Sequence, residues 1–567
     1  MSSTPLRIFA SLPLQSEEQT RKLLDLENCI FDKRQRQVAS IPKDWLLTDP
    51  PPSDQCNVFD IPRKCGMLSQ RELEITETDD VSVILKNLST GKWSAVEVTT
   101  AFSERAIVAH QLTNCLTEIW IEDALTRARE LDAAFAEHGP VGPLHGLPIS
   151  LKDQFDVAGK ECTMGIASWI GRISAEDAGL VTVLKNAGAV LYVRTNVPQT
   201  LMRGETDNWV FGLTTNPHNR TLAAGGSSGG EGALVALKGS PLGVGTDIGG
   251  SVRIPASFNG IYGLRPTMRR MPYYGASNTF LGLEAIESTL GPMSRSLSGL
   301  AEFVRAVTTS NPSDVDPKVV EMPWREDMYQ LKHIGGRDTK LCIAYYESDG
   351  VIMPHPPVRR AIQMTVAALR KAGHTVIKWE PYQHEFAHET IQRIFESDYG
   401  EDFDRIMAEA GEPLWPSIVH RSYPQITVWQ SWQLNREKEL FRKKTLEKWV
   451  ATKDLTGTGR PIDALLCPMA PHAAPPHETF EYTGYTSIFN FLDLPAAILP
   501  VTRVDPALDV KDEGYLPKSD LDAKIYNMYT PDTFRDAPVA VQLAGRRFRE
   551  EELLGICEVV DEALKAA

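Results

Sequence analysis

Short, continuously apolar segments alternate with amphipathic helical segments along most of this 567-residue chain. The segment 177–187 carries apolar residues at helical spacing, and AVLYV at 189–193 follows it as a strand. The same order recurs at 357–371 and 374–379. Because buried strands that alternate with amphipathic helices pack in layers, the pattern predicts an α/β fold. We expect a mixed, largely parallel central sheet with helices on both faces.

The first 75 residues differ from the rest of the chain. A charged helical stretch at 16–39 precedes a proline-rich connector, TDPPPSD, at 48–54. We interpret residues 1–75 as a helical N-terminal arm that packs onto the main body. Residues 76–567 are then expected to form a single large domain.

Composition limits the partners and the compartment of the chain. A net charge of −15 repels phosphate backbones, so we expect no nucleic-acid partner. The eight cysteines are scattered without a C-x-x-C, which favours reduced thiols over a disulfide framework or a zinc ribbon. No apolar run reaches the ~18 residues of a transmembrane helix, and Ser11 and Pro13 interrupt the N-terminal apolar stretch. We therefore expect a soluble cytoplasmic protein.

A lysine ends one of the short apolar strands. Leu147–Leu151 leads directly into Lys152, within PLHGLPISLKDQFDVAGK. Taken alone, such a lysine is often a solvated residue at a strand end. If Lys152 is buried instead, desolvation lowers its pKa and populates the neutral amine, which is a competent base.

A serine pair lies in a glycine-rich loop, AAGGSSGGEGALVALKG, at 223–239. Ser227 and Ser228 have glycines on both sides, namely Gly225, Gly226, Gly229 and Gly230. Glycines let a backbone approach a ligand closely, so we expect Gly225 and Gly226 to contact substrate. A helix at 231–238 would point its free N–H groups at the loop. A flexible linker is the alternative interpretation.

A second glycine turn carries another serine. In GVGTDIGGSVRIPASFNGIYGLRPT, Gly249 and Gly250 precede Ser251. Consecutive backbone N–H groups at such a turn can converge on one oxygen, as the tetrahedral oxyanion of acyl transfer requires. A simple tight turn is the alternative for this segment taken alone.

Together these three segments resemble the amidase signature family. The matching block runs from GGSSGGEGA through GTDIGGSVRIPA to NGIYGLRPT, and Ser251 lies 24 positions after Ser227. Lys152 lies 75 positions before Ser227, in GLPISLKD. The resemblance extends from about Ile84 to the C-terminus, and HQLTNCLTEIW at 110–120 looks most like the fungal acetamidase-type branch.

The resemblance implies a Ser-Ser-Lys triad within one amidase signature domain. Ser251 would be the nucleophile, Lys152 the terminal base, and Ser227 the bridge between them, next to an unusual cis peptide. Ser228 and Asp247 would orient the network, and Arg253 would brace the nucleophile loop. The implied oxyanion hole consists of the backbone N–H groups of Ile248, Gly249, Gly250 and Ser251.

The implied reaction is hydrolysis of carboxamides to a carboxylate and ammonia or an amine through an acyl-enzyme. It needs no metal and no organic cofactor, and the family resemblance is compatible with a homodimer. Pocket walls are expected near Met202 and in the aromatic-rich stretch 411–433, which holds Trp415, Trp429 and Trp432. We interpret that stretch as a packed helical hairpin, with an acyl channel as the alternative.

Four other functions also match parts of this sequence. His384, Glu385 and His388 match the zincin pattern H-E-x-x-H, although no third zinc ligand is evident. GGSSG and GSSGG fit the nucleophile elbow of α/β-hydrolases, but NPHNRTLAA is a poor strand to precede one. Glycine loops before helices also suit phosphate, although no P-loop lysine is present. Within the family, a glutamine-hydrolysing amidotransferase subunit is the alternative.

Overall fold

The computed structural model describes residues 8–9, 17–418 and 421–567. At its centre lies an eleven-stranded sheet among the described residues. In spatial order its strands are β1 (Leu116–Ile119), β3 (Val190–Thr195), β2 (Pro148–Lys152), β6 (Leu242–Asp247), β8 (Thr289–Ser294), β7 (Tyr262–Arg265), β12 (Ala496–Arg503), β13 (Pro538–Ala544), β11 (Ala464–Pro468), β9 (Cys342–Tyr345) and β10 (Thr375–Lys378). A separate two-stranded sheet pairs β4 (Thr215–Asn216) with β5 (Asn219–Ala223).

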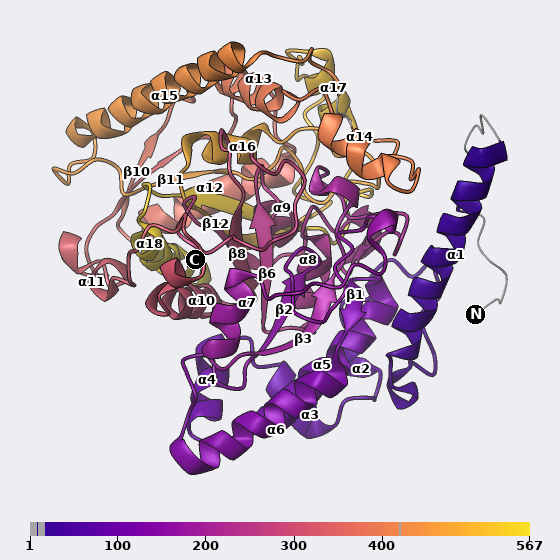
Figure 1. The fold of residues 1–567 in the computed structure, drawn as a ribbon. Helices are drawn as coiled ribbons and strands as arrows, with labels where there is room; N and C mark the ends of the chain where they lie inside the picture. The colour runs from indigo at the N-terminus through magenta and orange to yellow at the C-terminus, as the bar shows by residue number, and fades with distance from the viewer. Residues whose placement is uncertain (1–7, 10–16, 419–420) are drawn as a thin grey trace.

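Helices surround the central sheet on both faces (Figure 1). They are α1 (Glu17–Ala39), α2 (Ile61–Lys64), α3 (Gln70–Thr76), α4 (Val81–Ser89), α5 (Ala95–Thr113), α6 (Ile121–His138), α7 (Gly179–Asn186), α8 (Gly229–Ala236), α9 (Arg253–Phe258), α10 (Leu297–Thr309), α11 (Glu326–Tyr329), α12 (Pro356–Lys371), α13 (His384–Phe395), α14 (Glu401–Ala408), α15 (Val428–Ala451), α16 (Gly484–Leu492), α17 (Asp520–Asn527) and α18 (Glu550–Lys565). α8 and α9 pack together, and α12 packs with α18, each pair against strands of the sheet.

The α/β class and the mixed sheet are confirmed, but the share of parallel pairing is smaller than expected. Among the described strands, the pairs β2–β3, β2–β6, β9–β11 and β9–β10 are parallel, and the other six neighbouring pairs are antiparallel. One of the antiparallel pairs, β1–β3, lies at the edge of the sheet, and the other five occupy its middle. There the segment between β7 and β8 contains no helix and returns the chain in the opposite direction.

Two parallel strands position the candidate site. β2 and β6 are hydrogen-bonded in register, with Leu151 opposite Val244, so their carboxyl ends lie together. Every residue of both strands is buried. β6 needs its small residues, because a Cβ on Gly245 would lie 2.7 Å from Oγ of Ser228. The sheet thus brings Lys152, at the end of β2, next to the glycine loops.

The predicted N-terminal helix is present as α1, and it packs on the main body. Leu23, Leu26 and Ile30 are buried against a patch that includes Val210 and Phe211. Gln37 donates a hydrogen bond of 2.7 Å to the carbonyl of Leu116 in β1. The division at residue 75 itself stays a prediction.

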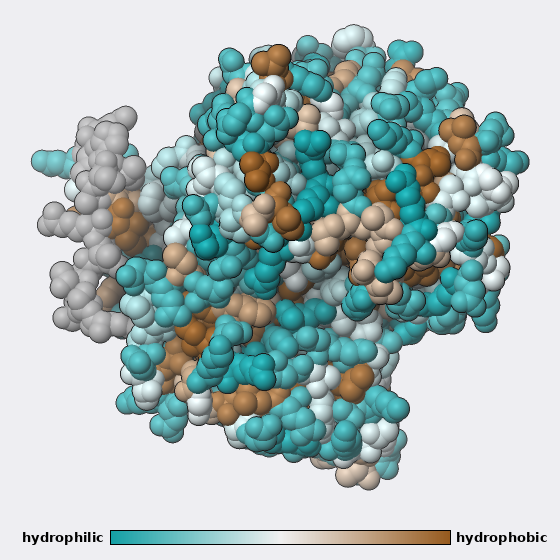
Figure 2. Space-filling model, turned by 180° about the vertical axis from the view of Figure 1, so that it is seen from behind, coloured by the Kyte–Doolittle hydropathy of each residue, from teal (hydrophilic) through white to brown (hydrophobic). Residues whose placement is uncertain are grey.

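The face of the molecule shown in Figure 2 is mostly hydrophilic, with hydrophobic side chains gathered in separated patches. Among the described residues, no helix has the length and apolar character needed to cross a bilayer. The stretch 411–433 is not the packed helical hairpin that we expected. Its first part contains no helix among the described residues, and Trp429 and Trp432 on α15 are 63% and 64% exposed. Trp415 instead packs on Trp209, at 4.3 Å between ring centroids.

Candidate active site

Lys152 is fully buried at the end of β2, so the solvated strand-end interpretation is wrong. Its Nζ lies 2.7 Å from Oγ of Ser227 and 2.7 Å from Oγ1 of Thr246. Burial lowers the pKa of Lys152 to about 7, although the negative charges of Asp247 and Glu231 oppose the shift. Near neutral pH a large fraction of this side chain is therefore an uncharged amine.

The loop before α8 is rigidly packed and is not a flexible linker. A cis peptide joins Gly226 to Ser227. Gly225 has a φ of +83°, and a Cβ on it would lie 2.7 Å from Cα of Pro255. A Cβ on Gly226 would lie 2.5 Å from the carbonyl oxygen of Arg203. Both glycines are thus required by close backbone contacts, and their predicted contact with substrate stays a prediction.

Ser251 lies on the turn that follows β6, beside the first loop. The N–H of Ser228 donates to the carbonyl of Ser251 at 3.2 Å, which ties the two loops together. The N–H of Thr246 also donates to Oγ of Ser228, at 3.3 Å. Ser251 is 8% exposed. Within the described chain, no hydrogen bond joins the hydroxyls of Ser227 and Ser251.

The predicted oxyanion hole has three of its four N–H groups available. The N–H of Gly250 donates to Oδ1 of Asp247 at 2.9 Å and is therefore already engaged. The N–H groups of Ile248, Gly249 and Ser251 have no protein acceptor among the described residues. The turn therefore offers a cradle of three donors rather than four.

A buried ion pair braces this turn. Arg253 donates from Nε and Nη2 to the carboxylate of Asp247, at 3.0 and 2.9 Å. Its Nη1 donates to the carbonyl of Thr486 and to Oε1 of Gln542, both at 2.8 Å. Burial raises the pKa of Asp247, but Arg253 and the amide of Asn490 outweigh this and hold it at about 2. The predicted bracing role of Arg253 agrees with these contacts.

We expect Arg253→Met to lower the free energy of unfolding by about 3–5 kcal/mol at pH 7, because Asp247 is left as an unpaired buried charge. Urea denaturation would measure the loss, with Arg405→Met on the exposed face of α14 as the control. Because the folded pKa of Asp247 lies below its unfolded value, the difference should shrink as the pH falls from about 4 toward 2. A loss no larger than that of Arg405→Met would contradict the bracing role.

A cavity of about 610 Å³ has Arg203 and Phe395 in its lining, and these two residues approach Gly226 and Gly249 of the glycine loops. Cε2 of Phe395 approaches to 4.0 Å the position that a Cβ on Gly249 would occupy. Met202, predicted as a pocket residue, lines the cavity. Phe280 stacks on Phe395 at 6.2 Å between centroids, and Phe403 adjoins Phe280. One wall of the cavity is thus apolar and aromatic.

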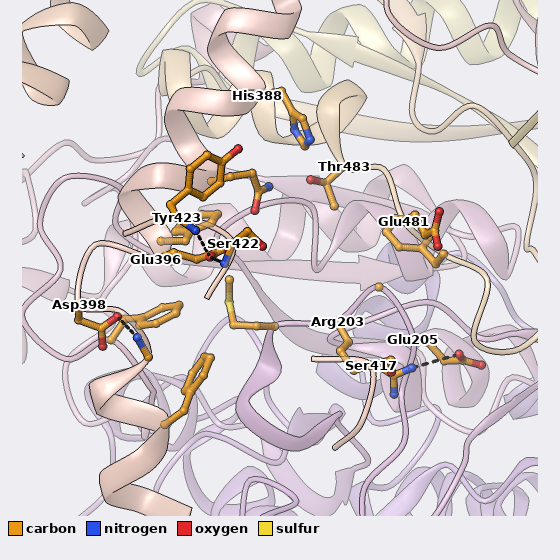
Figure 3. A pocket seen from close by; sticks show the side chains of 18 of the residues that line it. Arg203, Glu205, His388, Glu396, Asp398, Ser417, Ser422, Tyr423, Glu481 and Thr483 are labelled. Carbon is orange, nitrogen blue, oxygen red and sulfur yellow. Dashed lines mark hydrogen bonds and ion pairs between the residues drawn. The ribbon is translucent and has the colours of Figure 1, made fainter. Parts of the chain in front are cut away.

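The remaining walls carry mostly negative charge (Figure 3). Arg203 contributes the one guanidinium of the described lining. Burial lowers the pKa of His388 to about 4, so this imidazole is neutral at pH 7. The lining includes five carboxylates, from Glu205, Glu396, Asp398, Glu478 and Glu481. An anionic ligand would therefore meet like charges in this cavity.

The zinc alternative lacks a ligand set in the part of the chain that the structure describes. His384, Glu385 and His388 do lie on one helix, α13. His384 is buried against Tyr346, whereas His388 lines the large cavity. No group of three His, Cys, Asp or Glu side chains among the described residues is arranged to hold a metal ion.

The α/β-hydrolase and phosphate-binding alternatives are also not supported. Residues 219–223 form a strand, β5, contrary to our expectation, but β5 pairs with β4 and, through Leu222, with Pro476, outside the central sheet. The loop is therefore not a nucleophile elbow on the main sheet. The N–H groups that begin α8 are taken, because Gly229 donates to Thr206 and Gly230 to Asn196. This helix N-terminus is not open to a phosphate.

Sequence reasoning missed three polar residues around Lys152. Thr246 and Gln154 form a hydrogen-bonded chain that reaches its Nζ. Glu231, in α8, accepts from Ser150 at 2.6 Å, and burial raises its pKa to about 8. The signal was available for Glu231, since it is the one charged residue in an otherwise small and apolar helix.

The comparisons with known proteins agree with one another. A family model described as Amidase matches residues 97–554. The chain is 44% identical to an acetamidase of Emericella nidulans and 42% identical to an acetamidase of Aspergillus oryzae, in each case over 95% of this chain and 98% of the relative. It also resembles the solved structure of a fatty acid amide hydrolase, with a TM-score of 0.90 and 32% identity over 98% of both chains.

Proposed function

The chain belongs to the amidase signature family, and on that premise we propose that Lys152, Ser227 and Ser251 form its catalytic triad. The reaction is hydrolysis of a carboxamide to a carboxylate and ammonia or an amine. One observation carries the proposal: a fully buried lysine, with a pKa of about 7, contacts the hydroxyl of Ser227 beside the turn that bears Ser251.

The proposed mechanism moves one proton along the triad. Neutral Lys152 takes the proton of Ser227 as Ser227 takes that of Ser251, and Oγ of Ser251 attacks the amide carbonyl. Rotation of the Ser251 side chain supplies the contact to Ser227 that this structure does not make. The N–H groups of Ile248, Gly249 and Ser251 stabilise the oxyanion.

Collapse of the tetrahedral intermediate breaks the C–N bond. The proton held by Lys152 returns through Ser227 to the leaving nitrogen, which would otherwise depart as a poor anionic leaving group. Water then attacks the acyl carbon and gives its proton to the relay of Ser227 and Lys152. The proton returns to Oγ of Ser251 as the acyl bond breaks, which releases the carboxylate and free Ser251. No metal or organic cofactor takes part in this scheme. The predicted cytoplasmic location and homodimer belong to the proposal as well.

We assign the acyl group to the 610 Å³ cavity beside the nucleophile turn. Its size suits a ligand much larger than acetamide. Its aromatic wall favours apolar acyl groups, and its carboxylates disfavour anionic ones. The relatives described as acetamidases support a simple amidase over a glutamine-hydrolysing amidotransferase subunit.

The charge of the cavity predicts a substrate preference. We expect purified protein to hydrolyse phenylacetamide with a kcat/KM about 100-fold above that of its 4-carboxy derivative, because like charges brought together cost several kcal/mol. A 4-aminomethyl derivative, which is cationic, should react at least as well as the neutral amide. The assay measures ammonia and carboxylate released in equal amounts.

Two matched variants locate the source of that preference. The side chain of Glu478 has no hydrogen-bond or ion-pair partner among the described residues, although its N–H donates to Glu205, whereas the side chain of Glu481 pairs with Lys524. Glu478→Gln should therefore improve the 4-carboxy substrate more than Glu481→Gln does. Equal rates on all three amides would show that the acyl group binds elsewhere, and release of no ammonia from any amide would refute the proposed function.

A further inference from the structure

Lys152 has a second hydrogen-bonding neighbour on the side away from Ser227. Its Nζ lies 2.7 Å from Oγ1 of Thr246. That hydroxyl donates to Oε1 of Gln154 at 2.8 Å, and Nε2 of Gln154 donates to the phenol of Tyr273 at 2.7 Å. Thr246 and Gln154 are buried, and Tyr273 is half-buried.

The number of available protons sets the direction of donation in the hydrogen bonds from Lys152 through Thr246 to Gln154. A threonine hydroxyl has one proton to donate, and that of Thr246 goes to Gln154. Oγ1 of Thr246 therefore has only lone pairs to offer Lys152, and Lys152 must point an N–H at it. A neutral amine has two N–H groups and one lone pair, so this contact leaves the lone pair available for the other neighbour, Ser227.

We propose that Thr246 and Gln154 are positioning residues, which turn the lone pair of neutral Lys152 toward the hydroxyl of Ser227. This inference rests on the proposed triad and adds two residues to it. In this structure the phenol of Tyr273 accepts from Nε2 of Gln154, and Oε1 of the same amide faces Thr246. A reversed amide would make Thr246 a donor to Lys152 and would occupy the lone pair.

The two carboxyl groups near Lys152 do not act as hydrogen-bond acceptors for its Nζ, so Thr246 is the residue that orients the amine. Asp247 is engaged by Arg253 and by the amide of Asn490. Glu231 accepts from Ser150 at 2.6 Å and from Thr195 at 2.9 Å. Both carboxyl groups influence the charge of Lys152 through space, but neither hydrogen-bonds to its Nζ among the described residues.

Substitution of Thr246 is the first arm of the test. Thr246→Val keeps the shape and removes the acceptor, so we expect kcat to fall about 100-fold, within the range of a lost general base, with KM changed less than about 3-fold. Thr246→Ser retains the hydroxyl and should restore kcat to within about 5-fold of wild type. Thr365→Val, an equally buried threonine on α12, is the matched control for the substitution itself.

The second arm measures the pH–rate profile of each variant. If Thr246 and Gln154 had only a structural role, their substitution would not shift the rising limb of this profile in a predictable direction. Thr246→Val removes an acceptor of the ammonium and should shift the rising limb of the pH–rate profile to lower pH. Gln154→Glu keeps the acceptor and adds a negative charge, so it should raise the pKa of Lys152 and shift the limb about one unit upward. Gln154→Leu removes the acceptor and should resemble Thr246→Val.

Each rate is followed both as amide turnover and as the rate of fluorophosphonate labelling of Ser251. Labelling reports activation of the nucleophile without any amide substrate. Labelling that responds to Thr246 and Gln154 as described, with no amide turnover in the wild type, would refute the proposed function and keep this inference. Two results, each combined with normal amide turnover in the wild type, would overturn this inference and leave the proposed function intact. In the first, Thr246→Val is as active as Thr365→Val. In the second, the rising limbs of the pH–rate profiles of the Thr246 and Gln154 variants stay at the wild-type pH.

Discussion

Ser251→Ala is expected to lower kcat for a good carboxamide substrate by about 10⁴–10⁶-fold, as the loss of a nucleophile does in other serine hydrolases. The side chain lies on a glycine turn, where the N–H groups of Ile248 and Gly249 have no acceptor in the described part of the protein. Because alanine fits that turn, binding of substrate and oxyanion should survive. KM should therefore change far less than kcat, and the thermal midpoint should stay close to that of the wild type.

A fluorophosphonate probe tests the same residue by a covalent readout. One equivalent should be bound per chain, and mass spectrometry should place it on Ser251. Ser310→Ala, at the end of α10, is the control and should label and turn over normally. Labelling of a different serine, or a Ser251→Ala variant with more than about 1% of wild-type kcat, would overturn the assignment.

Lys152→Met is expected to cost about 10⁴-fold or more in kcat, because it removes the terminal base of a triad whose members act as a unit. Methionine has a similar length and suits a buried site. Lys152→Arg separates two explanations. An arginine keeps the hydrogen-bond donors to Ser227 and Thr246 but stays charged, so it should fail as a base.

The wild-type pH profile gives an independent check on Lys152. Burial lowers its pKa to about 7, and the proposed mechanism uses the neutral form. The rate should therefore rise with pH through about 7 and level off above it. Lys152→Arg should lose this limb in whatever activity remains. A limb near pH 7 that is retained in both Lys152 variants would mean that a different group is the base.

Local patterns in the sequence predicted many elements within one or two residues. The expected helix at 357–371 is α12, Pro356–Lys371, and the expected strand at 189–193 is β3, Val190–Thr195. Where long-range contacts decide, the predictions were less accurate. The direction of β8 depends on the path of the 23 residues after Arg265, which carry no periodic pattern. The aromatic side chains of Trp429 and Trp432 resembled packed residues, yet α15 leaves them exposed.

The sequence by itself determined the family and pointed to the three segments that we propose carry the chemistry. Glycines and serines at set spacings encode the turn conformations locally, and Lys152 follows its apolar strand directly. Only the tertiary structure decided that burial lowers the pKa of this lysine to about 7, that Gly250 is already engaged, and that Thr246 contacts Nζ and links it to Gln154. These properties arise from burial and from contacts between residues as many as 94 positions apart, and no short sequence pattern encodes them.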